Sequence, residues 1–174
     1  KNKRIITTQL VNLLTYLNNI IVRNKIVNDK AKDKKQIKNI AVVVDEFHLY
    51  LKNTDSEVLL TFEQIARRIR KYHGAFIPAT QSIHDFIGDD DSVRSATAIF
   101  NNCQYQLVGM LKEDDLTTYL KLFYQNPLTD TQKEFLMQAE MGEFLLTINS
   151  KNRIRVKILA TPIEVDLMGE ELKV

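Results

Sequence analysis

Two pairs of polar residues, Asp45-Glu46 and Thr80-Gln81, each follow directly on an apolar stretch of the chain. Adjacent carboxylates can divide two tasks: one can hold Mg²⁺ through a water, and the other can accept a proton from an attacking water. A glutamine amide can hydrogen-bond both a water and an anionic oxygen without adding charge. These four residues are the candidates for chemistry if the fold brings the two pairs together.

The apolar stretches predict two parallel strands. Residues 40–44 form an unalternated, mostly β-branched run, which is typical of a strand covered on both faces. Residues 75–81 repeat the pattern, and the helix expected between them buries Val58, Phe62, Ile65 and Ile69. A strand–helix–strand unit has parallel strands and a right-handed crossover. It would place both polar pairs at the carboxyl edge of the sheet, where open α/β sheets bind ligands.

The connecting helix has its own start and stop signals. Thr54 and Glu57 have the spacing of a capping box, and Gly74 is the expected left-handed stop. The end of the helix is crowded with basic residues, namely Arg67, Arg68, Arg70 and Lys71. The helix dipole favours cations at this end, but four in five positions exceed that need. We therefore expect at least one to point at a phosphate, bound to its own subunit or to a neighbour.

The remainder of the chain predicts further helices and strands around this unit. Residues 6–21 read as a helix, joined by the charged connection 28–35 to the first strand. After the acidic loop 88–91, helices are expected at 91–100 and from 113, with a strand at 104–111 between them. Thr129 and Gln132 form a second capping box. An abrupt start at Lys1 suggests a chain cut from something larger.

Residues 143–149 and 153–159 are expected to form an antiparallel hairpin. Three basic residues, Arg153, Arg155 and Lys157, alternate with apolar ones along its second strand. One face of that strand is therefore expected to be basic and exposed. Such a face would blunt an edge strand and could contact an acidic partner.

Composition sets outer limits on function. The chain has 174 residues, with 44% hydrophobic and 26% charged, which is ordinary for a soluble globular protein. A net charge of +2 does not by itself argue for nucleic-acid binding. The single cysteine, Cys103, excludes an internal disulfide. No apolar stretch reaches the length of a membrane span, and no signal peptide opens the sequence.

Several motifs together carry a resemblance to a known family. They are residues 42–46, 67–74 and 77–81, followed by 98–107 and the closing hairpin. From about Ile37 onward, the chain resembles the conjugation and type IV secretion ATPases of the TraE/CagE type, in the FtsK/HerA branch of RecA-like motors. A strand ending in Asp-Glu is the Walker B arrangement of these P-loop NTPases.

The resemblance implies an α/β fold with a RecA-like P-loop NTPase core. In that fold a parallel sheet is flanked by helices and is followed by a C-terminal antiparallel hairpin. Residues 1–174 would be a single domain, the C-terminal part of a RecA-like ATPase domain. Residues 1–36 would be its leading helix and charged linker, and 37–174 would run from Walker B to the hairpin.

The family also implies roles for the candidate residues, with ATP and Mg²⁺ as cofactors. Asp45 would hold the Mg²⁺ through water, and Glu46 would be the catalytic base. Gln81 would sense the γ-phosphate, with Thr80 beside it at the nucleotide. Arg70 matches the arginine that such hexamers present to the neighbouring subunit's nucleotide, and Arg67 is the fallback for this role as a nucleotide-binding residue.

One expected motif is absent. The Walker A loop, G-x-x-x-x-G-K-[ST], which cradles the phosphates, does not occur in the sequence. In the family it lies upstream in the same polypeptide, so we expect this chain to hydrolyse no ATP alone. The resemblance further implies a ring, a hexamer in the full-length protein, and contact with other secretion-channel subunits. DNA and the inner face of the cytoplasmic membrane are the remaining implied partners, the protein itself being cytoplasmic.

Three other interpretations stay open. Asp45-Glu46-Phe47-His48 also spells a DExH helicase box, although the arginine-rich final helicase motif is missing. The chain could be a non-catalytic docking module of the secretion complex, although such a module has no use for uncompensated carboxylates at a strand end. A metal-dependent hydrolase is the third, although the three histidines, His48, His73 and His84, lack ligand spacing.

Overall fold

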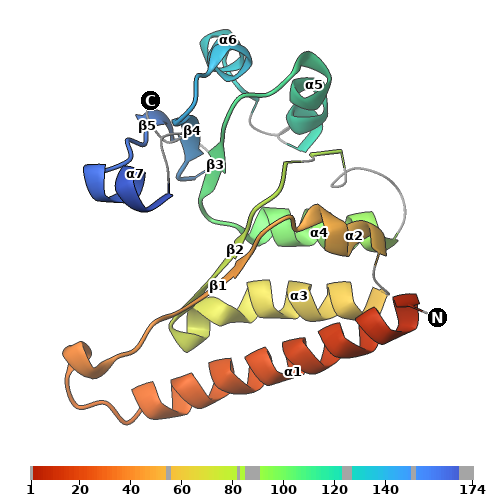
Figure 1. Cartoon of the computed structure of the whole chain (residues 1–174), viewed down its shortest axis with the longest axis vertical. Coiled ribbons are helices and arrows are strands. Elements are labelled where there is room, and N and C mark those ends of the chain that lie inside the picture. Colours follow the sequence, from red (N-terminus) through yellow and green to blue (C-terminus); the bar gives the residue numbers. More distant parts are fainter. Residues whose placement is uncertain are drawn as a thin grey trace. The chain divides into compact units, whose positions relative to one another are not determined.

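The computed structural model describes residues 2–53, 56–81, 83–84, 91–122, 127–149 and 152–168. The chain divides into two compact units, Lys1–Cys103 and Gln104–Val174, whose elements are labelled in Figure 1. Whether residues 1–174 act as one domain stays a prediction. Among the described residues, no helix combines the length and apolar character needed to span a membrane.

The first unit is built on two helices that lie side by side. Helix α1 (Asn2–Asn28) packs against α3 (Ser56–Arg68) through a buried stripe that includes Leu10, Leu14 and Ile21. At its end, the Asn28 side chain bonds both backbone groups of Lys38, donating at 2.8 Å and accepting at 2.9 Å. After the short 3₁₀ turn η1 (Lys34–Gln36), this clamp directs the chain into the first strand.

The predicted strand–helix–strand unit is confirmed. Strands β1 (Ile40–Val44) and β2 (Gly74–Pro78) pair in parallel, from Ile40 opposite Gly74 to Val44 opposite Pro78. Between them lie α2 (His48–Asn53), α3 and the 3₁₀ helix η2 (Ile69–Tyr72), and α4 (Asp91–Asn102) packs on α3. The helix α2 begins two residues after Glu46 and was not predicted from the sequence.

An aromatic cluster holds α3 against one face of this two-stranded sheet. The ring of Phe47, fully buried, lies edge-on to Phe62 of α3 and to Phe76 of β2, with centroids 5.3 and 6.0 Å apart. Val42 shares this buried face. The opposite face is open, since Val43 is 64% exposed and Ile77 is 47% exposed. Within the described part of the first unit, β1 is therefore buried on one face, and the expectation that this strand is covered on both faces is wrong there.

The junction between η2 and β2 corrects another prediction. The left-handed residue is His73, with φ of 57°, whereas Gly74 already belongs to the strand. Gly74 is needed for a different reason, which is close packing. A Cβ added there would lie 2.5 Å from Ile69 Cγ1 and 3.2 Å from the Ile40 carbonyl oxygen. The glycine lets the two strands and η2 meet at the amino end of the sheet.

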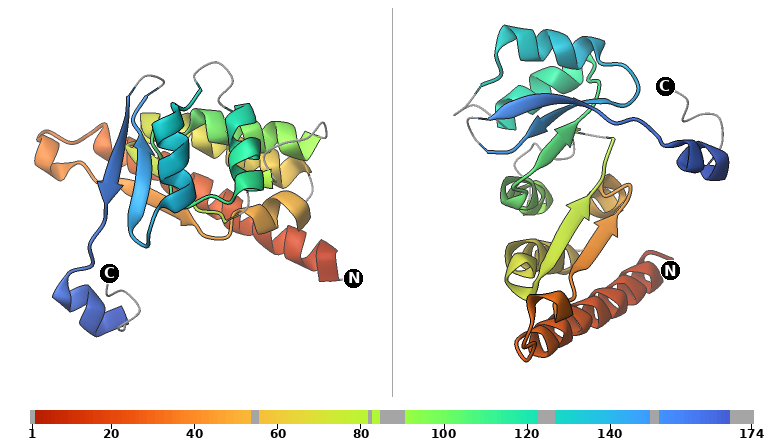
Figure 2. Two further views of the ribbon diagram at one scale, coloured as in Figure 1. Left: turned by 90° about the horizontal axis from the view of Figure 1, so that it is seen from above. Right: turned by 90° about the vertical axis from the view of Figure 1, so that its left-hand side faces the viewer.

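The second unit is a three-stranded antiparallel sheet with helices (Figure 2). Its strands, β3 (Gln106–Val108), β4 (Glu143–Thr147) and β5 (Arg153–Lys157), pair in chain order, which confirms the hairpin and places the shorter third strand beside it. Its helices are α5 (Glu113–Leu122), α6 (Asp130–Gln138) and α7 (Pro162–Met168). Tyr119 of α5, Leu136 of α6 and Leu145 of β4 are almost completely buried. The predicted capping box of Thr129 and Gln132 is present at the start of α6.

The basic row of β5 is engaged within its own unit. Arg153 Nη1 and Arg155 Nη2 donate to the carbonyl oxygens of Pro127 and Thr131, at 3.4 and 2.9 Å. Lys157 Nζ lies 3.6 Å from Glu143 Oε1. Arg155 and Lys157 remain exposed, as predicted. The carboxylate beside Lys157, however, is that of Glu143 in this chain rather than one from an acidic partner. The two arginines thus fasten β5 to the segment around α6, and Lys157 pairs with the neighbouring strand β4.

Some sequence predictions fall outside the described residues or side chains. They are the capping box of Thr54 and Glu57, the acids at 89–91, the capping of α4 at 91–92 and the hairpin turn at 150–151.

Candidate functional site

The backbone brings the ends of β1 and β2 to one edge. The Ala79 amide donates to the Val44 carbonyl, and the Phe47 amide donates to the Ala79 carbonyl, both at 2.8 Å. Parallel pairing thus continues past the strands themselves. Asp45-Glu46 and Thr80-Gln81 are consequently held on neighbouring segments at the carboxyl edge of the sheet.

The turn after β1 gives Glu46 an unusual backbone conformation. Its φ is 48°, in the left-handed region, which costs a non-glycine residue roughly 1–2 kcal/mol. Two hydrogen bonds hold the turn: the Glu46 amide donates to Asp45 Oδ1 at 2.8 Å, and the Glu46 carbonyl accepts from the Leu49 amide at 2.9 Å. Strained residues that persist in this way cluster at functional sites.

The side chains of the two polar pairs meet. Gln81 Nε2 donates a hydrogen bond of 2.6 Å to Glu46 Oε1, which confirms the predicted proximity of the carboxylate and the amide. The other carboxylate oxygen, Oε2, lies 3.2 Å from His48 Nδ1. The same ring nitrogen is 3.3 Å from Thr80 Oγ1. Glu46 therefore lies between a residue of the second strand's end and the first residue of α2.

Burial divides this cluster into an inner and an outer side. The His48 side chain is 16% exposed and Glu46 Oε2 is buried, whereas the Glu46 side chain as a whole is 40% exposed. Asp45, Thr80 and Gln81 are exposed. A ligand would accordingly approach from the side of Asp45 and Gln81 and would meet two carboxylates, a hydroxyl and an amide.

The oxygen atoms at this edge suit a cation that is coordinated by the protein and by a bound ligand together. Asp45 and Glu46 offer hard carboxylate oxygens of the kind Mg²⁺ prefers. Among the described residues, no group of three or more His, Cys, Asp or Glu side chains is arranged to hold a metal. Mg²⁺ in nucleotide sites needs only one or two carboxylates, with phosphates and water completing its shell.

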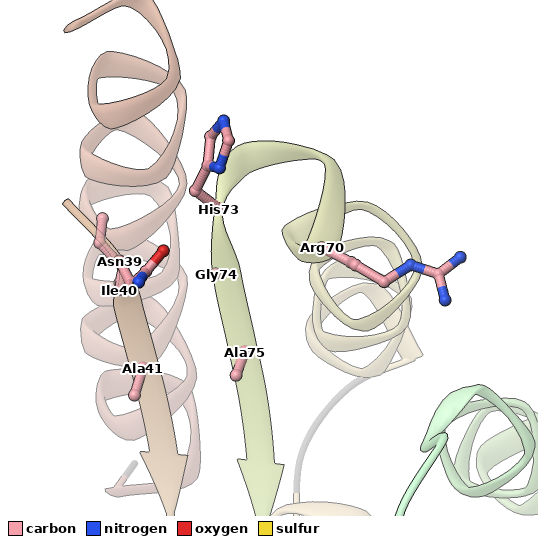
Figure 3. Close-up of a pocket in the computed structure, with 7 residues that line it drawn as sticks. All are labelled: Asn39, Ile40, Ala41, Arg70, His73, Gly74 and Ala75. Carbon is pink, nitrogen blue, oxygen red and sulfur yellow. The ribbon is translucent and has the colours of Figure 1, made fainter. Parts of the chain in front are cut away.

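The two candidate arginines lie at the opposite end of the strands. Arg70 belongs to η2, which leads into the amino end of β2, roughly 13 Å along a five-residue strand from the carboxylates. Its guanidinium points away from both strands (Figure 3). It lines an open pocket of about 400 Å³, together with Asn39, Ile40, Ala41, His73, Gly74 and Ala75. Arg67 forms an ion pair with Glu63, 2.5 Å away on the same helix. Neither arginine is brought to Glu46 of its own chain.

The contact between His48 and Glu46 at this edge was not predicted from the sequence. The sequence suggests packing or a loop hydrogen bond, because a lone histidine after an acidic pair matches no ligand spacing. The feature that could have indicated this contact is the local geometry of the turn. A tight turn at Glu46 returns the chain to the sheet edge, so that the side chain two residues on can reach the carboxylate.

Comparison with known proteins places this geometry in context. No family model matches the chain, and neither does any curated protein sequence. Among solved structures, VirB4 of Thermoanaerobacter pseudethanolicus superposes with a TM-score of 0.72 at 25% sequence identity, over 94% of this chain. The chain resembles part of VirB4. It spans 39% of the length of that protein.

VirB4 is a type IV secretion ATPase of the TraE/CagE family, so the resemblance drawn from residues 42–46 and 77–81 is confirmed. The predicted α/β class is confirmed in a coarse form. The described chain combines a small parallel sheet with a three-stranded antiparallel sheet and matches part of the VirB4 structure. The roles of the individual site residues stay predictions.

Proposed function

We propose that this chain carries the Walker B and sensor half of the ATP-hydrolysing motor of a conjugative DNA-transfer or type IV secretion system. The observation that carries the proposal is the 2.6 Å hydrogen bond between Gln81 and Glu46 at the carboxyl edge of a parallel sheet. The structural similarity to VirB4 supports the same interpretation. The core around these residues would be RecA-like.

ATP with Mg²⁺ would supply the phosphoryl group and the charge-neutralising cation at this edge. Asp45 would hold the cation through a water, as its exposed position directly after β1 permits. Glu46 would orient the attacking water and accept its proton. Gln81 would donate to a γ-phosphate oxygen, and the Thr80 hydroxyl would lie beside it. In phosphoryl transfer such positioning and electrostatic stabilisation account for most of the catalysis.

The phosphate-cradling loop would come from another segment of the parent polypeptide. The open face of the sheet supports this, because parallel sheets in stable proteins are covered on both faces. Val43 and Ile77 present exposed aliphatic side chains where such a segment would pack. We expect the 174-residue chain, mixed with ATP and Mg²⁺, to give no turnover above buffer. Measurable turnover would mean that another phosphate site exists.

The position of Arg70 supports a ring. Because its guanidinium lies at the amino end of the strands, it would serve a nucleotide bound to the neighbouring subunit. An arginine supplied in trans stabilises transition-state charge. Arg67, which is paired with Glu63, is the less suitable of the two. The assembly would be a hexamer on the inner face of the cytoplasmic membrane, in contact with other channel subunits and with DNA.

The test is Glu46→Gln in the full-length parent, which keeps the side chain's shape and removes the base. Hydrolysis should fall by about 10²-fold or more, the usual contribution of a general base, while ATP binding survives. Glu134→Gln is the matched control, because Glu134 is an exposed glutamate of α6 in the second unit. A hydrolysis rate within a few-fold of the parent would remove Glu46 from the role of base.

A further inference from the structure

The two oxygens of the Glu46 carboxylate have different surroundings. Oε1 accepts from the amide of Gln81, an exposed residue. Oε2 is buried and accepts no hydrogen bond in the structure, although Nδ1 of His48, whose side chain is 16% exposed, lies 3.2 Å away. One oxygen thus faces the side from which a ligand would approach, and the other faces the protein.

We propose that His48 is a positioning residue: its Nδ1, 3.2 Å from the unpartnered Oε2, donates to that oxygen and anchors Glu46 when Gln81 exchanges its bond to Oε1 for a bond to the γ-phosphate. The inference rests on the proposed function. In the structure the Gln81 amide donates to Glu46, although the proposed mechanism requires it at the phosphate. When Gln81 turns to the phosphate, Oε1 becomes available to the attacking water, and Oε2 needs a second support to keep the carboxylate in place.

His48 is suited to this task because its own position is fixed. It is the first residue of α2, and it follows Phe47, which is fully buried in the aromatic cluster with Phe62 and Phe76. The Tyr50 amide donates to the Phe47 carbonyl at 3.0 Å, which closes the first turn. The imidazole can therefore hold the glutamate even though the glutamate backbone is in a strained conformation.

The anchor requires one tautomer of the imidazole. An ionised carboxylate accepts hydrogen bonds and donates none, so the proton of neutral His48 must lie on Nδ1, the nitrogen beside Oε2. Thr80 Oγ1, 3.3 Å from the same nitrogen, then serves as a second acceptor. In free histidine the Nδ1–H tautomer is the minor one. A His48 ring protonated on Nε2 would leave Oε2 without a donor.

The first arm of the test reads the tautomer directly. The 174-residue chain is labelled with ¹⁵N-histidine, and long-range ¹H–¹⁵N spectra are recorded at a pH where all imidazoles are neutral. His73→Asn and His84→Asn variants assign the three ring systems. We expect protonated Nδ1 for His48 and protonated Nε2 for the exposed His73. A His48 ring protonated on Nε2 overturns the proposal.

The second arm measures hydrolysis in the full-length parent. His48→Asn keeps an amide donor near the position of Nδ1, whereas His48→Gln places its amide nearer to Nε2, and His48→Ala has no donor. Misplacing a catalytic group by about 1 Å can cost about 10²-fold in rate. We expect a loss of that order in kcat for the Ala and Gln variants with KM unchanged, and recovery of most of it in the Asn variant.

The outcomes separate the two proposals. If Glu46→Gln abolishes hydrolysis but His48→Ala leaves kcat unchanged, the anchor is wrong and the proposed function stands. If all three His48 variants lose activity equally, the imidazole is needed for its size and packing rather than for its Nδ1 proton. The proposal that His48 anchors Glu46 is then again wrong. If Glu46→Gln itself remains active, the proposed function fails first.

Discussion

Replacing Gly74 by alanine tests the packing that delivers β2, and with it Thr80 and Gln81, to the sheet edge. The new Cβ would lie 2.5 Å from Ile69 Cγ1 and 3.2 Å from the backbone oxygen of Ile40. Real Cβ atoms essentially never come as close as 2.5 Å to another atom, so Ile69, which is 3% exposed, must move within a packed core. Overpacking of this kind typically costs about 1–3 kcal/mol. We expect a loss in that range from the free energy of unfolding of the first unit.

A double-mutant cycle isolates the clash from other effects of the substitution. Ile69→Ala removes the clashing atoms at a cost of about 2–5 kcal/mol. In that background Gly74→Ala should cost much less than in the parent, giving a coupling of about 1 kcal/mol or more between neighbours in contact. Urea unfolding monitored by circular dichroism gives the free energy of unfolding of the parent and the three variants, provided that its dependence on urea concentration is the same in all four proteins.

Gly109→Ala is the matched control in the second unit. Its added Cβ would lie 3.4 Å from Phe144 Cε1, which is ordinary contact. Loss of glycine freedom in the unfolded chain should then leave the stability unchanged or raise it by about 0.4–1 kcal/mol. If Gly74→Ala proves as harmless as Gly109→Ala, or if Ile69→Ala does not relieve it, the close approach at the junction is not what Gly74 serves.

Three further predictions concern other parts of the molecule. Burial raises the pKa of Tyr119 to about 12 from 10.0, so the folded state favours the neutral phenol. The free energy of unfolding should therefore fall by about 2 kcal/mol as the pH rises from 10 to 12, and by about 3 kcal/mol in total above pH 12. Tyr119→Phe should remove this part of the alkaline loss, and in the parent one tyrosine should ionise late at 295 nm. Thr129→Ala should cost the second unit about 1 kcal/mol in urea unfolding, because it removes the N-cap of α6, and Thr129→Ser should restore most of it. Arg70→Ala should abolish turnover in uniform rings of the full-length parent and recover in part in rings mixed with parent subunits, whereas an unchanged rate in uniform rings would remove Arg70 from the trans role.

The position of the site at the sheet edge could be predicted from the sequence, because it depends only on the strand pattern and on the parallel arrangement of the strands. Unalternated apolar runs at 40–44 and 75–81 marked strands joined by a helix, and the parallel direction of such strands put Glu46 and Gln81 at one edge. Their proximity followed from the topology, whereas the 2.6 Å hydrogen bond between their side chains did not.

Details that depend on close three-dimensional packing were not predictable in this way. The left-handed residue is His73 rather than Gly74, and Gly74 instead lies where Ile69 and the Ile40 carbonyl oxygen leave no room for a Cβ. The contact of His48 with Glu46 depends on a strained turn and an unpredicted helix, α2. The exposure of Val43 depends on what packs against the sheet, which the composition of the strand does not specify.

The most direct test of the central claim is the position of the γ-phosphate in the full-length parent bound to Mg²⁺ and a non-hydrolysable ATP analogue. We predict that a γ-phosphate oxygen accepts from the Gln81 amide, with the Mg²⁺ shell reaching Asp45 through water and Glu46 Oε1 released from Gln81. A γ-phosphate bound away from this edge, with the Glu46–Gln81 bond intact, would contradict the account.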